Sequence, residues 1–161
     1  MKQFILCIVL VFTGFCVAAQ VEKNKTGIGA GLLLAIPVYN LDISSVGGGG
    51  DLLLQYGLSG KTALTADVAF IGLPGKNNYP STAIVPIRLG VRYFPVPKIY
   101  AGAKAGLGIY TILKASASHF AYAVSGGYLL TKKIEAGLFY DGYSNKNTSF
   151  GYAGIRAGYN F

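Results

Sequence analysis

Along most of this chain, apolar side chains alternate with small or polar ones, and the charged side chains keep to the polar side of the alternation. The final stretch, Ile155-Arg156-Ala157-Gly158-Tyr159-Asn160-Phe161, has its apolar residues at odd positions only. Because successive side chains of a β-strand point to opposite faces, each such segment has one apolar and one polar face. The position of each charge therefore predicts which face of a sheet it occupies.

Turn-forming clusters of Gly, Pro, Asn and Ser divide the chain into eight alternating segments. Each has about the length that a tilted membrane-spanning strand requires. The predicted strands lie at about residues 26–37, 46–56, 61–72, 83–94, 99–112, 119–130, 133–143 and 148–161.

Four acidic and four basic residues share the polar face of these strands, interspersed with glycine. They are Asp51, Asp67, Arg88, Arg92, Lys104, Glu135, Asp141 and Arg156. The opposite face carries no charge, so the acids and bases are predicted to pair inside a closed sheet. A water-soluble barrel would have the reverse arrangement, with charge outside and apolar residues within.

The composition favours a membrane environment for the apolar face, since 52% of the residues are hydrophobic and 12% are charged. After residue 20 there is no run of about 18 apolar residues, which a membrane helix would need. In lipid every backbone polar group needs an internal partner, so alternating strands must close into a barrel. The predicted fold is an all-β, eight-stranded, antiparallel up-and-down transmembrane barrel.

The first residues have the features of a cleaved signal peptide. Lys2 precedes an apolar stretch, and Val17-Ala18-Ala19 supplies the small residues that a signal peptidase requires. We expect a signal peptide at 1–19 and a barrel domain at 20–161. Cleavage would remove Cys7 and Cys16, which leaves no thiol for a disulfide or metal site. The net charge of +8 can indicate nucleic-acid binding, but an exported chain rarely meets nucleic acid.

An even number of strands predicts that both ends of the mature chain lie on the periplasmic side. The periplasmic connections would then be short and the outer ones longer, with the last of the outer ones at 144–147 and another at 113–118. Lipid-facing aromatic residues near the strand ends, such as Tyr56 and Tyr122, are typical of the aromatic bands at a membrane interface.

The signal peptide, eight alternating strands, short inner turns and terminal Tyr159-Asn160-Phe161 resemble the small outer-membrane β-barrel family of the OmpX and OmpA-barrel type. The segment from Val85 to Tyr93 is similar to Bacteroidetes members. The resemblance implies a bacterial outer-membrane location and a closing strand, with Tyr159 and Phe161, that signals to the barrel-assembly machinery. It also implies a monomer surrounded by outer-membrane lipid and lipopolysaccharide.

Three functions stay open on the sequence. An eight-stranded barrel has little interior space beyond its own side chains, which favours a plugged, non-enzymatic barrel with a structural or surface-interaction role. A narrow ion or small-solute channel is one alternative, and a lipid-modifying enzyme is another. The enzyme would depend on His119 with Ser116 or Ser118 and with Asp141 or Asp42, although Ser118 has the wrong parity to share a face with His119.

Three lysines in separate outer loops, Lys76, Lys114 and Lys146, are predicted to contact the phosphates of lipopolysaccharide by Coulomb attraction. The residues suggest no catalytic, cofactor or metal site.

Overall fold

The computed structural model describes residues 23–39, 44–77, 79–113, 115–146 and 148–161. Eight strands make up this part of the chain: β1 (Thr26–Tyr39), β2 (Gly47–Ser59), β3 (Thr62–Leu73), β4 (Thr82–Val96), β5 (Ile99–Ile112), β6 (Ala115–Leu129), β7 (Ile134–Ser144) and β8 (Ser149–Asn160). The signal peptide predicted at 1–19 lies outside the described residues, as do Asp42 and Lys114. No helix among the described residues is long and apolar enough to cross a membrane.

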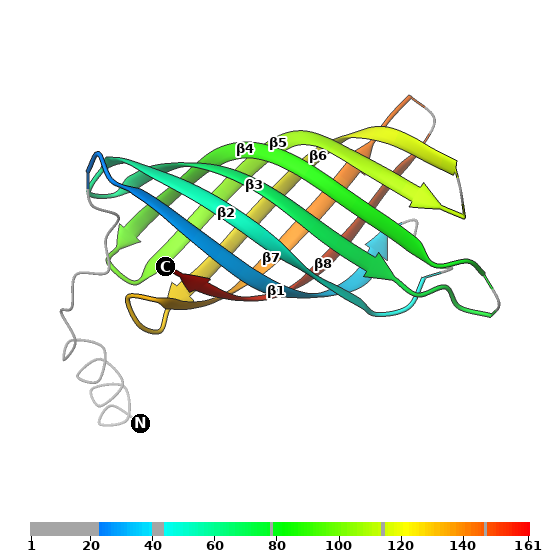
Figure 1. Ribbon diagram of the computed structural model, residues 1–161, viewed down its shortest axis with the longest axis horizontal. Coiled ribbons are helices and arrows are strands. Elements are labelled where there is room, and N and C mark those ends of the chain that lie inside the picture. Colours follow the sequence, from blue (N-terminus) through cyan, green and yellow to red (C-terminus); the bar gives the residue numbers. More distant parts are fainter. Residues whose placement is uncertain (1–22, 40–43, 78, 114, 147) are drawn as a thin grey trace, which may run out of the picture.

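The strands form one closed antiparallel barrel in which each pairs with its neighbours in the sequence (Figure 1). Closure comes from β1, which pairs with β8 in a register that places Leu33 opposite Arg156. The end that holds Lys23 and Phe161 is here termed proximal, and the opposite end distal (Figure 1). The eight-stranded, antiparallel, up-and-down architecture predicted from the alternation is confirmed.

The β5–β6 connection differs from the prediction. Residues 115–118 were expected in a loop, yet β6 begins at Ala115 and pairs with Ile112 across a connection of two residues. The segment Ala115-Ser116-Ala117-Ser118 has no large apolar residue, so its alternation is invisible in the sequence. Leu113 makes the tight turn with a positive φ of 55°, a conformation that costs a side-chain-bearing residue free energy.

Pro86 interrupts the ladder between β3 and β4 without changing its register. Asp67 pairs with Arg88 on one side of the interruption, and Ile71 pairs with Ile84 on the other. The two pairs are in the same register, so neither β3 nor β4 has a bulge between them. A proline has no amide hydrogen to donate, which explains the local gap in pairing.

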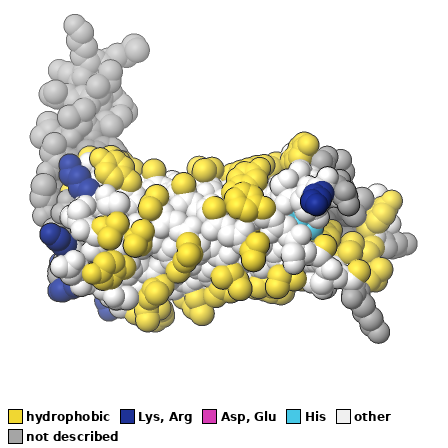
Figure 2. All heavy atoms as spheres, turned by 90° about the horizontal axis from the view of Figure 1, so that it is seen from above, with side chains coloured by type: hydrophobic (Ala, Val, Ile, Leu, Met, Phe, Trp, Pro, Cys, Tyr) yellow, Lys and Arg dark blue, Asp and Glu magenta, His cyan; other side chains and the backbone are white. Residues whose placement is uncertain are grey.

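The two faces of the barrel have opposite chemistry, as the parity of the charges predicts. Large apolar side chains point outward along every strand, with Leu32 75% and Leu89 69% exposed. In Figure 2 they cover the sides of the barrel, while lysine side chains gather at its proximal end. Arg88, Arg92 and Glu135 are at most 5% exposed. An apolar surface of this extent exceeds what a monomer in water ordinarily exposes.

Candidate functional site in the barrel interior

The register of the strands brings acidic residues next to basic ones inside the barrel. Asp67 on β3 lies directly opposite Arg88 on β4. Asp51 on β2 and Arg156 on β8 are not neighbours in the sheet, but both reach over β1, where Gly31 leaves the space between them. A Cβ atom at Gly31 would lie 2.5 Å from Asp51 Oδ1 and 2.8 Å from Arg156 Nε. The structure brings together all eight charged residues singled out in the sequence.

Four of these residues form one chain of ion pairs, here termed the Arg88 cluster: Lys104, Asp67, Arg88 and Asp141. The Arg88 guanidinium donates to both carboxylate oxygens of Asp67, with Nη2 2.6 Å from Oδ2. Its Nη1 atom lies 2.6 Å from Asp141 Oδ2. Lys104 Nζ lies 3.3 Å from Asp67 Oδ2 and completes the chain.

The other four residues form a second chain, the Arg92 cluster: Arg92, Glu135, Arg156 and Asp51. Glu135 lies between the two arginines, accepting from Arg92 Nη1 at 2.9 Å and from Arg156 Nη1. Arg156 also donates from Nε and Nη2 to the two oxygens of Asp51, at 2.6 and 2.9 Å. Asn160 Nδ2 donates to Glu135 Oε2 at 3.5 Å.

Each cluster contains two acids and two bases, so each is neutral by itself. A buried charge without a partner costs several kcal/mol, whereas paired and hydrogen-bonded charges recover most of that cost. The forked contacts of Arg88 and Arg156 with carboxylates are the strong, geometrically specific kind. The interior therefore has no excess of either sign within the described residues.

A layer of aromatic side chains fills the barrel on the distal side of the Arg88 cluster. The rings of Tyr143 and Phe150 stack with centroids 5.0 Å apart. The hydroxyls of Tyr143 and Tyr152 lie 2.7 Å apart, and Tyr152 donates to Asp141 Oδ2 at 3.0 Å. The Tyr110 ring packs against Phe150. This layer joins the charged cluster to an apolar distal core.

A smaller aromatic group lies on the proximal side, where Tyr100 packs against Phe94 with ring centroids 6.1 Å apart. The Arg92 guanidinium carbon lies 4.0 Å from the centroid of the Tyr100 ring, a cation–π contact. Tyr100 has room for its ring because Gly127 and Gly137 face it; a Cβ at either would lie 2.6 Å from its hydroxyl.

These inward aromatic residues were not predicted from the sequence. The signal was present in the parity, since positions 100, 110, 143, 150 and 152 fall on the charged side of their strands. Only the lipid-facing aromatic residues near the strand ends were assigned a role, at the membrane interface. In the folded barrel, the aromatic rings occupy the space that the absent side chains of the glycines leave.

Little space remains between the two clusters. A cavity of about 30 Å³ lies among the charged residues of both clusters and Tyr100. That volume has room for a water molecule or two.

His119, the residue on which a lipid-modifying enzyme would depend, lies inside the barrel. It is 5% exposed, and its Nε2 atom is 2.8 Å from Asn145 Nδ2. Its ring packs edge-on against Tyr110 and Phe150. Ser118 points to the opposite face of β6, as its parity predicts, and Ser116 shares a hydrogen bond with Thr111. The described contacts of His119 thus include no serine.

The remaining predicted residues lie at the two ends of the barrel. Lys76 and Lys146 are exposed at the distal end, and Lys114 lies outside the described residues. Tyr159 and Phe161 are exposed on the outer face at the proximal end, with ring centroids 5.2 Å apart. No group of three His, Cys, Asp or Glu side chains among the described residues is arranged to hold a metal ion.

Comparison of the sequence with protein-family models and with curated proteins gives no match. Solved structures do match. Neisserial surface protein A has a TM-score of 0.65 at 16% identity, over 84% of this chain and 95% of that one. The N-terminal barrel of Pseudomonas aeruginosa OprF has a TM-score of 0.62 at 15% identity, over 88% of this chain and all of that one.

Ail, the attachment invasion locus protein of Yersinia pestis, has a TM-score of 0.62 at 13% identity, over 87% of this chain and all of that one. A further structure of Ail contains the heparin analogue sucrose octasulfate. The present chain therefore has the fold of the small eight-stranded outer-membrane barrels, in agreement with the resemblance seen in its sequence.

Proposed function

We propose that this chain is a non-enzymatic integral protein of the bacterial outer membrane, with a plugged interior and a structural or surface-interaction role. One observation carries the proposal: the outer surface of the barrel is apolar and uncharged along the strands, while eight charged residues pair inside. Lipid is the solvent that stabilises such an arrangement.

The plugged interior is supported by the packing around the two charged clusters. Aromatic layers lie on both sides of them, and the cavity between them has a volume of only about 30 Å³. A continuous water path would require several paired side chains to move together. We therefore expect no ion conduction by the folded barrel.

Recordings from planar lipid bilayers test this expectation. Purified barrel should give no stepwise current, because neutral, packed clusters leave no wide path for ions. The double variant Glu135→Ala/Arg92→Ala removes the Arg92–Glu135 and Arg156–Glu135 ion pairs and widens the interior, so we expect it to conduct more readily than the unaltered protein. Ohmic single-channel steps from the unaltered protein would instead favour a narrow channel.

The surface-interaction role concerns the distal lysines. Lys76 and Lys146 are exposed at the distal end, and Lys114 lies between β5 and β6 in the sequence. Binding of a sulfated ligand by Ail is a property of that protein. For this chain we propose that the three lysines bind the phosphates of lipopolysaccharide, weakly and with salt dependence.

Replacement of Lys76, Lys114 and Lys146 by Gln should lower the lipopolysaccharide retained after purification, and added salt should do the same to the unaltered protein. Equal retention of lipopolysaccharide by the triple variant and the unaltered protein contradicts the contact.

The proposed function includes a signal peptide at 1–19 and both mature termini in the periplasm. It also includes recognition by the barrel-assembly machinery at Tyr159 and Phe161, and a monomeric barrel.

A further inference from the structure

A lysine directly precedes each of the four strands that begin at the proximal end. Lys25 precedes β1, Lys61 precedes β3, Lys98 precedes β5 and Lys133 precedes β7. These four residues are here termed the proximal lysines. Of the four strands that begin at the distal end, only β6 is also preceded by a lysine, Lys114, whereas Val46, Ser81 and Thr148 precede β2, β4 and β8.

The backbone holds the four lysines in equivalent positions around the barrel. The carbonyl of each accepts a hydrogen bond from an amide near the end of the next strand. The donors are Gly57 to Lys25 at 3.0 Å, Phe94 to Lys61 at 2.7 Å, Leu129 to Lys98 at 2.8 Å and Asn160 to Lys133 at 2.7 Å. Since adjacent strands lie about 4.8 Å apart, neighbouring proximal lysines are about 10 Å apart in the hydrogen-bonding direction.

Each proximal lysine comes with a tyrosine on the outer face. The residue after the lysine is paired across the sheet with that tyrosine: Thr26 with Tyr56, Thr62 with Tyr93, Ile99 with Tyr128 and Ile134 with Tyr159. The lysine–tyrosine unit is thus repeated four times around the rim. Tyrosine with one apolar and one polar end is suited to the boundary between acyl chains and headgroups.

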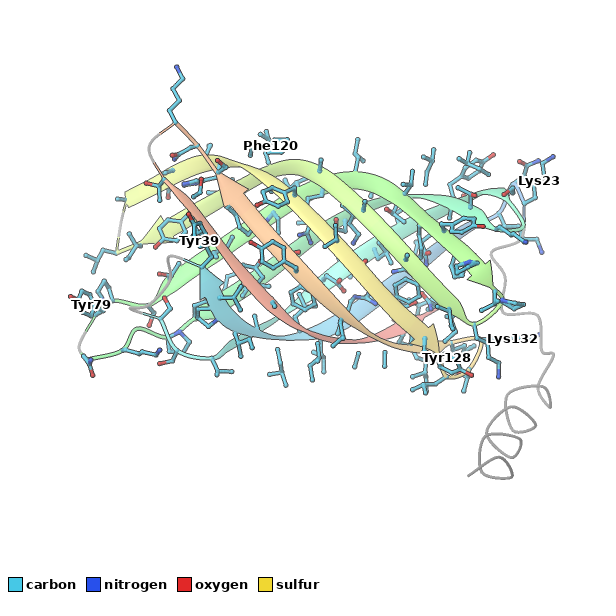
Figure 3. The ribbon with its side chains drawn as sticks, turned by 180° about the vertical axis from the view of Figure 1, so that it is seen from behind. Lys23, Tyr39, Tyr79, Phe120, Tyr128 and Lys132 are labelled. Carbon is cyan, nitrogen blue, oxygen red and sulfur yellow. The ribbon has the colours of Figure 1, made fainter. Side chains whose placement is uncertain are left out.

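Two of the units show the ammonium group next to the ring. Lys98 Nζ lies 6.0 Å from the centroid of the Tyr128 ring, and Lys133 Nζ lies 5.7 Å from that of Tyr159. Lys23 and Lys132 add two more exposed cations to the same end, where Tyr128 is also seen (Figure 3). The four carboxylate side chains that the structure describes are all inside the barrel. Six lysines lie at this rim, and none of the carboxylate side chains that the structure describes lies there.

We propose that the proximal rim is a binding site for anionic phospholipids, with the proximal lysines contacting the headgroup phosphates and the paired tyrosines lying at the depth of the ester groups. The proposal rests on the proposed function, because it requires that the outer face be in lipid. The site goes beyond the proposed function because it assigns anionic phospholipids to the proximal end, opposite Lys76 and Lys146.

The observations favour a lipid over a soluble or cell-wall polyanion. The Lys98 and Lys133 ammonium groups lie over rings that belong to the apolar outer face, so they reach toward the membrane plane and not along the barrel axis. Lysine side chains of this kind keep their stems against apolar surface and their charge in the headgroup layer. The four lysine–tyrosine units, two of which show this contact, surround the barrel at the level where lipid headgroups would lie.

Native mass spectrometry of protein purified from the outer membrane of a bacterial host tests the proposal. Phosphatidylglycerol and phosphatidylcholine with identical acyl chains are added in detergent at low salt, and the lipids retained are counted. The unaltered protein should prefer phosphatidylglycerol. The variant Lys98→Gln/Lys133→Gln should lower its affinity for that lipid by on the order of 20-fold, about fivefold for each lysine.

The matched control is Lys23→Gln/Lys132→Gln, which changes the net charge equally at the same end but alters no lysine–tyrosine unit, and it should leave phosphatidylglycerol binding within about twofold. Equal retention of both lipids by the unaltered protein, or equal loss in both double variants, overturns the proposal. Cosedimentation with peptidoglycan that depends on Lys98 and Lys133, without any lipid preference, overturns it in favour of a cell-wall ligand.

The failure of the underlying function has a different signature. Unboiled barrel should migrate differently from boiled barrel on an SDS gel, and both double variants should keep that difference. An unaltered protein that shows no difference in mobility and fails to insert into vesicles contradicts the membrane assignment itself. A parent that inserts and shifts normally but ignores lipid charge contradicts only the lysine–tyrosine site.

Discussion

At the scale of single residues, Glu135 is the most connected group of the interior. It is 1% exposed and accepts hydrogen bonds from Arg92, Arg156 and Asn160. Two arginines therefore pair with this one carboxylate, whereas Asp51 forms an ion pair with Arg156 alone among the described residues. Charge is balanced in the Arg92 cluster only while Glu135 is ionised and in place.

Replacing Glu135 by Gln should lower the free energy of unfolding by about 3–5 kcal/mol, because it leaves a buried guanidinium without its anion. Urea unfolding in lipid vesicles measures the change. Lys146→Gln, an exposed control, should stay within about 0.5 kcal/mol. The double variant Glu135→Gln/Arg92→Met restores neutrality, so its loss should be smaller than that of Glu135→Gln alone; a larger, additive loss would contradict the coupling.

At the scale of elements, β1 closes the barrel by pairing with both β2 and β8. Its inward positions include Gly27 and Gly31, which differ in what surrounds them. Gly31 lies beneath the Asp51–Arg156 ion pair, while nothing lies within 4 Å of a Cβ atom at Gly27. The same strand thus combines a crowded inward site and an empty one, four residues apart.

The substitution Gly31→Val should lower the stability of the barrel by about 1–3 kcal/mol, because the new side chain displaces the ion pair above it. Gly27→Val places the same side chain on the same face of β1 and should change stability by no more than about 0.5 kcal/mol. The midpoint of urea unfolding in vesicles distinguishes them. Equal effects at the two positions would mean that the loss reflects strand geometry and not the ion pair.

At the scale of the whole molecule, the protein is inverted relative to a water-soluble barrel. Leu89, midway along β4, is 69% exposed on the outer face, and Arg88 beside it is 5% exposed inside. A one-residue slip of β4 would exchange these environments and expose Arg88 and Arg92 together. The register of the barrel is therefore determined by the solvent around it.

Leu89→Lys should destabilise the barrel in vesicles by about 2–4 kcal/mol, the cost of a cation on the lipid face near the midplane. Leu113→Lys makes the same chemical change at a distal turn residue that is 80% exposed, and we expect a change of about 0.5 kcal/mol or less there. Were both substitutions neutral, the outer face would be in water and the membrane assignment would fail.

Much of the fold could be predicted because strand periodicity is a local property. The side chains of a strand alternate whatever the strand packs against, so the positions of Leu32, Arg88 and Arg156 on opposite faces follow from parity alone. The number of strands, their direction and the face on which each of the eight charges lies needed no tertiary information. The prediction failed at residues 115–118, because that segment has no large apolar side chains whose alternation could reveal a strand.

The tertiary structure decided which charges meet and what fills the space between them. Parity places Asp67, Asp141 and Glu135 inside, but only closure of the sheet separates the Arg88 cluster from the Arg92 cluster. The contact of His119 with Phe150, and the pairing of lysine and tyrosine units around the proximal rim, likewise depend on how different strands are aligned with one another. The alternation along a strand is a property of one chain segment, whereas each contact across the barrel is a property of two or more segments that only closure brings together.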